Sequence, residues 1–238
     1  MSAEYIILHD SPHTETQTWE AAVETPVRKL SLALAKPETA HPDSGFLTPT
    51  SVRNLIDQQV NVFIQYGFGN HNPFSDSDYA DTGAEFTTPY ADLAMLSHLI
   101  LKFDAFTFDQ IALSKEKQIL FSILSPDNMT QEYLEAVNEK KITMICLDLL
   151  KNEQGVSIME QIRKETLSDA GFQIALSNFL FPITETLVHA PSIPYALQRA
   201  PELMQCVLCH AGTLCHQQTA ETLRLPWRDI LSLCWDLN

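Results

Sequence analysis

The stretch Val60-Asn-Val-Phe-Ile-Gln-Tyr-Gly-Phe-Gly69 (VNVFIQYGFG) is typical of a buried β-strand that ends abruptly. Valine, phenylalanine and isoleucine favour strands, and the two glycines give the backbone the freedom that a sharp turn needs. The next segment, Ser75-Asp-Ser-Asp-Tyr79, is typical of a helix start, because acidic side chains stabilise the first turn of a helix. A strand, a turn and a helix in this order predict one unit of an α/β fold.

The same alternation extends in both directions along the chain. Upstream, Leu30–Ala35 predicts a strand, and Leu47-Thr-Pro-Thr-Ser51 predicts a helix with Thr48 as N-cap and Pro49 at its first position. Alternating strands and helices predict a mostly parallel sheet. After about residue 157 the pattern predicts helices only. Downstream apolar runs lie at 99–101, 119–124 and 142–147, separated by helical segments near 106–114 and 129–140.

Composition narrows the function classes. The chain has 238 residues, of which 45% are hydrophobic, enough for one good-sized core or two small ones. Thirty acidic residues against fifteen basic ones give a net charge of −15, which argues against nucleic acid or an anionic membrane as partner. We find no apolar run of about 18 residues and no signal-peptide pattern at the N-terminus, so we expect a soluble cytoplasmic protein with reduced cysteines.

Three groups of residues stand in an order found in a known family. They are Ala35-Lys-Pro-Glu38 before Leu47-Thr-Pro49, then Val62–Gly69, then Phe74-Ser-Asp-Ser-Asp-Tyr79 before Gly83-Ala-Glu85. In this order they resemble the substrate domain of the alanine dehydrogenases and the related nicotinamide nucleotide transhydrogenases. The resemblance implies a single three-layer α/β domain with a mostly parallel, Rossmann/flavodoxin-like sheet and a C-terminal helical segment packed back on it. It continues through Ile100-Leu-Lys102, Gln118-Ile-Leu-Phe121 and Thr130-Gln-Glu-Tyr-Leu134.

The resemblance breaks off near Ile158–Ile162 and resumes at Ala175–Pro182. The first stretch is where the family crosses into its dinucleotide-binding domain, and the second is similar to the helix on which it returns. The resemblance therefore implies that the cofactor domain is missing, with a seam between residues 162 and 175. The expected organisation is an N-terminal extension (1–28) and one domain (29–238), made of βα units (29–162) and returning C-terminal helices (163–238).

The glycine pattern of the chain also argues against a nucleotide cofactor. A dinucleotide site needs a glycine-rich turn between a strand and a helix, so that the backbone can approach the pyrophosphate. The chain has only seven glycines. The close pair Gly67 and Gly69 precedes Ser75-Asp-Ser-Asp78, whose carboxylates would repel a phosphate, so a plain strand-ending turn is the favoured interpretation.

The resemblance also indicates what has happened to the substrate site. The family holds a substrate carboxylate with an arginine and a lysine, and a histidine acts as acid and base. In register, the arginine position is Ser44, the histidine position is Ser125, and only the lysine, Lys102, is kept. A lone lysine at a strand end is usually solvated. We therefore predict a catalytically inactive domain that serves as a binding or protein-interaction module, with a carboxylate sensor that binds a keto or amino acid at Lys102 as the alternative.

The segment Cys206-Val-Leu-Cys-His-Ala-Gly-Thr-Leu-Cys-His216 (CVLCHAGTLCH) offers a second alternative, a metal-binding protein. Haem attachment at CxxCH requires export, and no signal for it exists. Zinc could be bound by Cys206, Cys209, Cys215 and His216, but the paired CxxC…CxxC spacing of structural sites is absent. In register with the family the segment lies in a helical hairpin. Core packing of the cysteines is therefore favoured over metal binding.

The remaining candidates are weaker. We interpret His41, His71, His98 and Asp92 as surface residues or turn residues, and no Gly-x-Ser-x-Gly elbow supports Ser122 or Ser125 as a nucleophile. Loss of a domain would expose apolar surface, and such surface usually finds a partner. We therefore expect a dimer, or an unknown protein partner, at the helical region Ala175–Leu187, where Phe179, Leu180 and Phe181 are adjacent.

Overall fold

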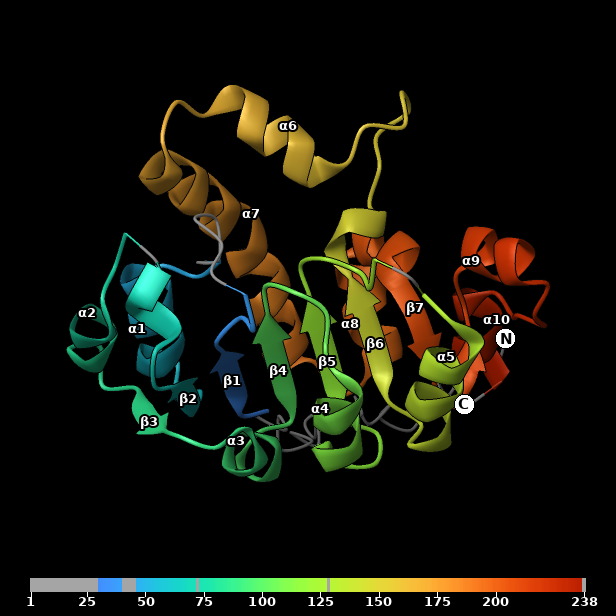
Figure 1. The fold of residues 1–238 in the computed structure, drawn as a ribbon, viewed down its shortest axis with the longest axis horizontal. Helices are drawn as coiled ribbons and strands as arrows, with labels where there is room; N and C mark the ends of the chain where they lie inside the picture. The colour runs from blue at the N-terminus through green and yellow to red at the C-terminus, as the bar shows by residue number, and fades with distance from the viewer. Residues whose placement is uncertain (1–29, 40–45, 72, 128, 237–238) are drawn as a thin grey trace, which may run out of the picture.

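The computed structural model describes residues 30–39, 46–71, 73–127 and 129–236. One eight-stranded sheet runs through the middle of the molecule, and helices cover both of its faces (Figure 1). In order across the sheet the strands are β3 (Glu85–Thr87), β2 (Val62–Gln65), β1 (Leu32–Ala35), β4 (Leu99–Lys102), β5 (Ile119–Ser122), β6 (Thr143–Cys146), β7 (Val207–His210) and β8 (Thr213–Leu214).

The six strands from β3 to β6 are parallel, which confirms the predicted mostly parallel sheet. The chain builds outward from β1 to β2 and β3, then crosses back to place β4 on the other side of β1. This is the strand order of doubly wound Rossmann sheets, and the order reverses between β1 and β4. β1, β2, β4, β5 and β6 are buried along their whole length, as strands covered on both faces must be.

Two hydrophobic cores, one on each face of the sheet, account for the three layers. The 3₁₀ turns are η1 (Phe68–His71), η2 (Leu147–Leu149) and η3 (Pro201–Cys206). The first core is covered by α1 (Pro49–Asp57), α2 (Asp76–Ala80), α6 (Ile158–Glu165), α7 (Asp169–His189), α8 (Ile193–Arg199) and α10 (Ile230–Asp236). The second is covered by α3 (Tyr90–Leu96), α4 (Phe108–Leu113), α5 (Gln131–Glu139) and α9 (Gln217–Leu223).

The helix starts agree with the sequence prediction. Thr48 caps α1 by accepting a hydrogen bond from Ser51 N, and Pro49 takes the first helical position. Ser75 caps α2 in a capping box with Asp78. Each of these side chains satisfies a backbone N–H that has no partner inside its own helix.

Polar contacts attach α7 to the beginning of the domain. The Ser177 hydroxyl accepts a hydrogen bond from Thr48 N at 3.0 Å and lies 2.9 Å from Ser51 Oγ, and all three residues are buried. Leu30 N donates to Val188 O at 3.0 Å. The returning C-terminal segment is therefore bonded to α1 and to the residues before β1.

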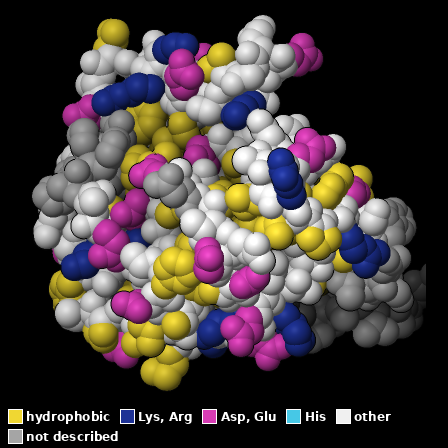
Figure 2. Space-filling view, turned by 45° about the vertical axis from the view of Figure 1, so that its right-hand side comes forward, with side chains coloured by type: hydrophobic (Ala, Val, Ile, Leu, Met, Phe, Trp, Pro, Cys, Tyr) yellow, Lys and Arg dark blue, Asp and Glu magenta, His cyan; other side chains and the backbone are white. Residues whose placement is uncertain are grey.

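The burial of side chains on α7 corrects part of the predicted dimer surface. Leu180 lies in the core with no exposed area, and Phe179 and Phe181 are partly buried against it. Ile174, which directly precedes the predicted stretch Ala175–Leu187, has a large apolar side chain that is 46% exposed. Helix α6 lies beyond the carboxyl ends of the parallel strands (Figure 1), and apolar side chains gather in the hollow between it and the body of the molecule (Figure 2).

Within the described ranges, no helix is both long and apolar enough to cross a membrane.

The prediction of helices alone after residue 157 is wrong. β7 and β8 form an antiparallel hairpin, and β7 joins the sheet by pairing antiparallel with β6. The turn of the hairpin consists of Ala211 and Gly212, with φ of 50° and 82°. Two left-handed residues in succession are what a tight two-residue hairpin turn requires. The segment 206–216 is therefore a strand hairpin and not the predicted helical one.

Candidate functional site

The carboxyl ends of β1 and β4 form the candidate site, because ligands of open α/β sheets bind where the strand order reverses. β4 ends at Lys102 and is followed by Asp104. β1 ends at Ala35, and Glu38 follows three residues later. The two chain segments meet here, since Glu38 N donates to Asp104 Oδ2 at 2.8 Å.

Lys102 is fully buried, so the expectation of a solvated lysine is wrong. Its Nζ donates to the carbonyl oxygen of Ala105 and to Gln110 Oε1, each at 2.9 Å. The carboxylate of Asp104 lies 3.0 Å from Nζ, and that of Glu38 lies 3.6 Å away. Burying an ammonium group is costly unless it is paired and hydrogen-bonded, and here the chain itself supplies both kinds of partner.

Gln110 joins the lysine to the acidic pair. It stands in the first turn of α4, where Thr107 N donates to its Oε1 at 3.0 Å. The same oxygen accepts from Lys102, while Gln110 Nε2 donates to Glu38 Oε1 at 2.7 Å. The capping box of α4 thus holds the amide in the orientation that satisfies both charges.

A second potential anion site lies after β2. The backbone N–H groups of Gly67 and Gly69 both donate to the carboxylate of Asp76, each at 2.7 Å. A Cβ on Gly69 would lie 2.4 Å from Asp76 N, so this close approach requires glycine. Backbone amides arranged in this way can bind a phosphate. Here the first residue of α2 already supplies the anion.

Ser125, the position of the family's histidine, has a carboxylate partner as well. Ser125 Oγ donates to Asp148 Oδ2 at 2.7 Å, and Ser125 N donates to Asp148 Oδ1 at 3.0 Å. Asp148 belongs to η2, just after β6. Asp148 therefore accepts hydrogen bonds from both the hydroxyl and the backbone N–H of Ser125. Ser44, the position of the family's arginine, lies outside the described residues, as does His41.

The other predicted candidates lie elsewhere. His98 precedes β4 at the opposite end of the sheet, and its Nδ1 lies 2.8 Å from Ser31 Oγ. Asp92 is in the first turn of α3, with Thr87 Oγ1 at 3.5 Å. Ser122 is buried in β5. None of the three contributes to the carboxyl edge near Lys102.

The cysteines are buried and distributed over both cores. Cys206 and Cys215 pack in the core under α7, and Cys209 packs in the core under α5. Burial raises the pKa of the Cys215 thiol to about 12, and it raises the pKa of Cys206 and Cys209 as well. Thiols with raised pKa values are protonated at neutral pH and are poor nucleophiles. His216 caps α9, with its Nδ1 2.8 Å from Thr219 Oγ1. Among the residues that the structure describes, no three His, Cys, Asp or Glu side chains are grouped as metal ligands.

A protein-family model matches the part of the chain that contains Lys102. Residues 46–162 match the model of the family described as alanine dehydrogenase/PNT, N-terminal domain. This stretch belongs to that family. The alanine dehydrogenase/PNT match begins at Phe46, covers the parallel strands from β2 to β6, and ends at Ile162 inside α6.

Three solved structures are similar to part of the chain. The transhydrogenase from Sinorhizobium meliloti matches with 20% identity and a TM-score of 0.43, over 50% of this chain and 36% of that protein. An L-alanine dehydrogenase matches with 22% identity and a TM-score of 0.43, over 52% and 34%. The apo form of D-mandelate dehydrogenase from Rhodotorula graminis matches with 13% identity and a TM-score of 0.37, over 66% and 48%. The match spans about a third of the length of the first two proteins.

Sequence reasoning missed the residues that define this edge. Asp104 and Gln110 were not expected to have a role, and Glu38 was noted only as part of the family's turn. Asp76 was noted only as a first-turn acid whose carboxylate would repel a phosphate. A signal did exist, because Asp104 stands two residues after the retained lysine. A carboxylate so close to a strand-end lysine indicates an internal ion pair as readily as a ligand site.

Proposed function

We propose that this chain is a catalytically inactive substrate domain of the alanine dehydrogenase type that acts as a binding or protein-interaction module. The observation that carries the proposal is the state of Lys102, which is buried and paired with Asp104 and Glu38. A substrate carboxylate would have to displace two carboxylates that are covalently part of the chain. Gln110 and the buried ammonium group of Lys102 would then have to form new hydrogen bonds.

The chain between α6 and α7 supports the loss of a cofactor domain. Only Thr166, Leu167 and Ser168 separate the end of α6 at Glu165 from the start of α7 at Asp169. The family match ends at Ile162, one turn earlier. We propose that this short connection replaces the dinucleotide-binding domain. Without that domain there is no hydride donor, and hydride transfer needs the donor positioned against the substrate.

A titration tests the substrate side of the proposal. Calorimetry with pyruvate and with alanine should give no saturable heat for the natural chain. Asp104→Asn removes one of the two competing charges, and this variant should bind pyruvate more tightly than the natural chain does. Asp109→Asn, an acidic residue of α4 that contributes nothing to the Lys102 site, is the matched control. Saturable micromolar binding of pyruvate by the natural chain would favour the carboxylate-sensor alternative instead.

A second experiment tests the catalytic side. NADH fluorescence should show no saturable binding, and absorbance at saturating alanine and NAD should show no turnover. Loss of general acid–base catalysis alone costs about 10²–10⁴ in rate, and loss of the hydride donor removes the reaction. Turnover that Lys102→Ala abolishes would contradict the proposal.

Two further measurements address what the module binds. We propose self-association through the exposed part of α7 around Ile174, which is 46% exposed. Light scattering at high concentration should report a dimer, and Ile174→Glu should give a monomer. A clean monomer for the natural chain would leave an unrelated protein as the partner.

Metal analysis of protein purified without chelator tests the alternative at Cys206, Cys209, Cys215 and His216, and stoichiometric zinc would support it.

A further inference from the structure

A cavity of about 390 Å³ lies at the amino ends of β5 and β6, at the edge of the sheet opposite Lys102, and is here called the amino-edge cavity. Lys117 and Lys141 line it from the chain segments that lead into β5 and β6. His210 lines it from the end of β7, which runs antiparallel to β6. The start of α8 supplies the remaining wall. The volume lies within the range of small-molecule sites, about 300–1,000 Å³.

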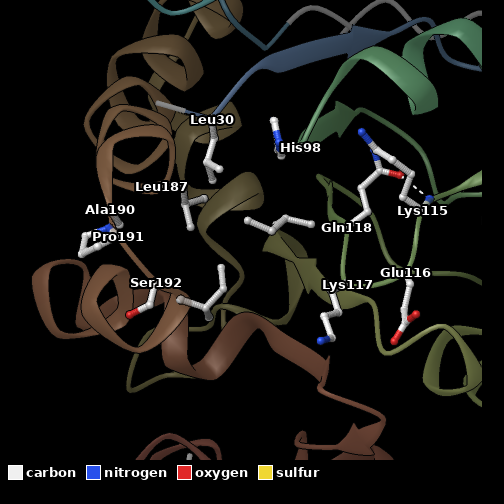
Figure 3. Close-up of a pocket in the computed structure, with 12 residues that line it drawn as sticks. Leu30, His98, Lys115, Glu116, Lys117, Gln118, Leu187, Ala190, Pro191 and Ser192 are labelled. Carbon is white, nitrogen blue, oxygen red and sulfur yellow. Dashed lines mark hydrogen bonds between the residues drawn. The ribbon is translucent and has the colours of Figure 1, made fainter. Parts of the chain in front are cut away.

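An adjoining cavity shares Lys117, Ser192 and Ile193 with the amino-edge cavity. Figure 3 shows it, with Lys117 across from Ser192. The other nearby lysine of this second cavity is already bonded, because Lys115 Nζ donates to Met95 O at 3.0 Å. Lys117 is therefore the cation that both cavities have available.

One positive charge of the amino-edge cavity is not balanced. Lys141 pairs with Glu116 at 3.0 Å. Within the described part of the chain, the ammonium group of Lys117 forms neither an ion pair nor a hydrogen bond. Arg28 and Lys29, which lie outside the described residues, carry the same sign as Lys117. A ligand with one negative charge would neutralise the charge that Lys117 leaves.

His210 supplies a hydrogen-bond donor to the same cavity. Its buried ring places Nδ1 2.9 Å from Oγ1 of the buried Thr143. The Thr143 hydroxyl has no other acceptor among the described residues, so it donates to Nδ1, and the proton of the neutral ring is on Nε2. Burial lowers the pKa of His210 below its usual value of 6.5, which keeps the ring neutral at pH 7. In the described ranges Nε2–H has no acceptor, and a buried donor needs one.

The other walls of the amino-edge cavity are largely apolar, with Ile193 and Pro194 on one side and Ala211 on another. Apolar walls favour a hydrocarbon group and disfavour a strongly hydrated dianion such as phosphate. We propose that the amino-edge cavity binds a small monocarboxylate with a hydrocarbon tail. The carboxylate accepts hydrogen bonds from Lys117 Nζ and His210 Nε2, and the tail packs on Ile193 and Pro194. The proposal does not depend on the lost activity.

Calorimetry of the full chain with hexanoate tests the proposal, and saturable binding is expected. Lys117→Gln should weaken the binding about tenfold, because it removes a hydrogen bond from a charged group. Lys164→Gln is the matched control, since Lys164 is an exposed lysine on α6 that pairs with Glu160, and it should leave the affinity unchanged. Hexanol, which has the tail without the charge, should bind at least tenfold more weakly. Pyruvate, which lacks the tail, should give no saturable heat.

Nuclear magnetic resonance locates the ligand. In a chain labelled with ¹⁵N-histidine, hexanoate should shift the ring signals of His210, which His210→Gln identifies by their loss. The ring of His216, which caps α9, is the internal reference and should not respond. The proposal is overturned by an absence of saturable heat, by equal affinities of the natural chain and Lys117→Gln, or by unchanged His210 signals. Hexanol that binds as tightly as hexanoate would leave only an apolar pocket, and tighter binding of inorganic phosphate would make the cavity a phosphate site instead.

Discussion

The two edges of the sheet carry similar charged groups in opposite states. At the carboxyl edge, Lys102 is buried and its charge is balanced by Asp104 and Glu38. At the amino edge, Lys117 borders an open cavity and forms no ion pair among the described residues. Doubly wound folds usually bind their ligands at the carboxyl edge. Here the chain's own carboxylates already neutralise the lysine at that edge. A retained fold and a retained lysine therefore do not preserve a binding site unless the charge of the lysine stays available to a ligand.

The largest expected effect contrasts the two lysines. Lys102→Met leaves Asp104 without its cation in a partly buried place, and it should lower the free energy of unfolding by about 3 kcal/mol, the low end for a broken buried pair. Lys117→Met should change it by no more than about 0.5 kcal/mol, as surface substitutions do. Urea unfolding of both variants measures the difference. Equal losses would show that the two edges are not in opposite states.

The next effect concerns the glycine turn after β2. Asp76→Asn removes the charge that accepts hydrogen bonds from Gly67 N and Gly69 N, and it should cost about 1.5 kcal/mol, since hydrogen bonds to charged groups contribute about 1.5–3 kcal/mol. Asp81→Asn, at the other end of α2, is the control and should cost less than about 0.5 kcal/mol. Added phosphate should not stabilise the natural chain in a thermal melt. If phosphate stabilises it as much as it stabilises Asp76→Asn, the turn is not occupied as described.

The smallest effect is a pH dependence at the amino edge. His210 is the last residue of β7 and lies at the amino edge, where burial lowers its pKa below the usual value of 6.5. As the pH falls through about 6.5 the unfolded chain takes up the proton first, so the folded state loses stability there. His210→Gln should therefore show a smaller fall in unfolding free energy between pH 7 and pH 5 than the natural chain. Identical slopes would contradict a buried neutral imidazole at this position.

The parallel half of the fold was predictable because its signals are local. Apolar runs such as Ile119–Leu124 are long enough for one strand, and Thr48, Pro49 and Ser75 mark helix starts by chemistry that acts within a few residues. The Lys102 site was not predictable in the same way. Glu38 and Gln110 lie 72 residues apart in the chain, and they meet only because β1 and β4 are neighbours in the sheet.

The β7–β8 hairpin was missed for a different reason. Its strands are short, and the family register of the segment favoured a helical interpretation. The signal that could have found it is Ala211-Gly212, a two-residue turn with glycine at its second position. Local turn chemistry was a better guide there than the family register.

The hydrogen bonds between α1 and α7 can form only late in the synthesis of the chain. Ser51 and Ser177 are 126 residues apart, and a ribosome adding about 5–20 residues per second needs roughly 6–25 s to cover that distance. Until α7 emerges, the side of Val52 and Leu55 that α7 will help to enclose stays open to water. The nascent chain therefore exposes apolar surface for many seconds before its last third can cover it, and exposed surface of this kind is what chaperones bind.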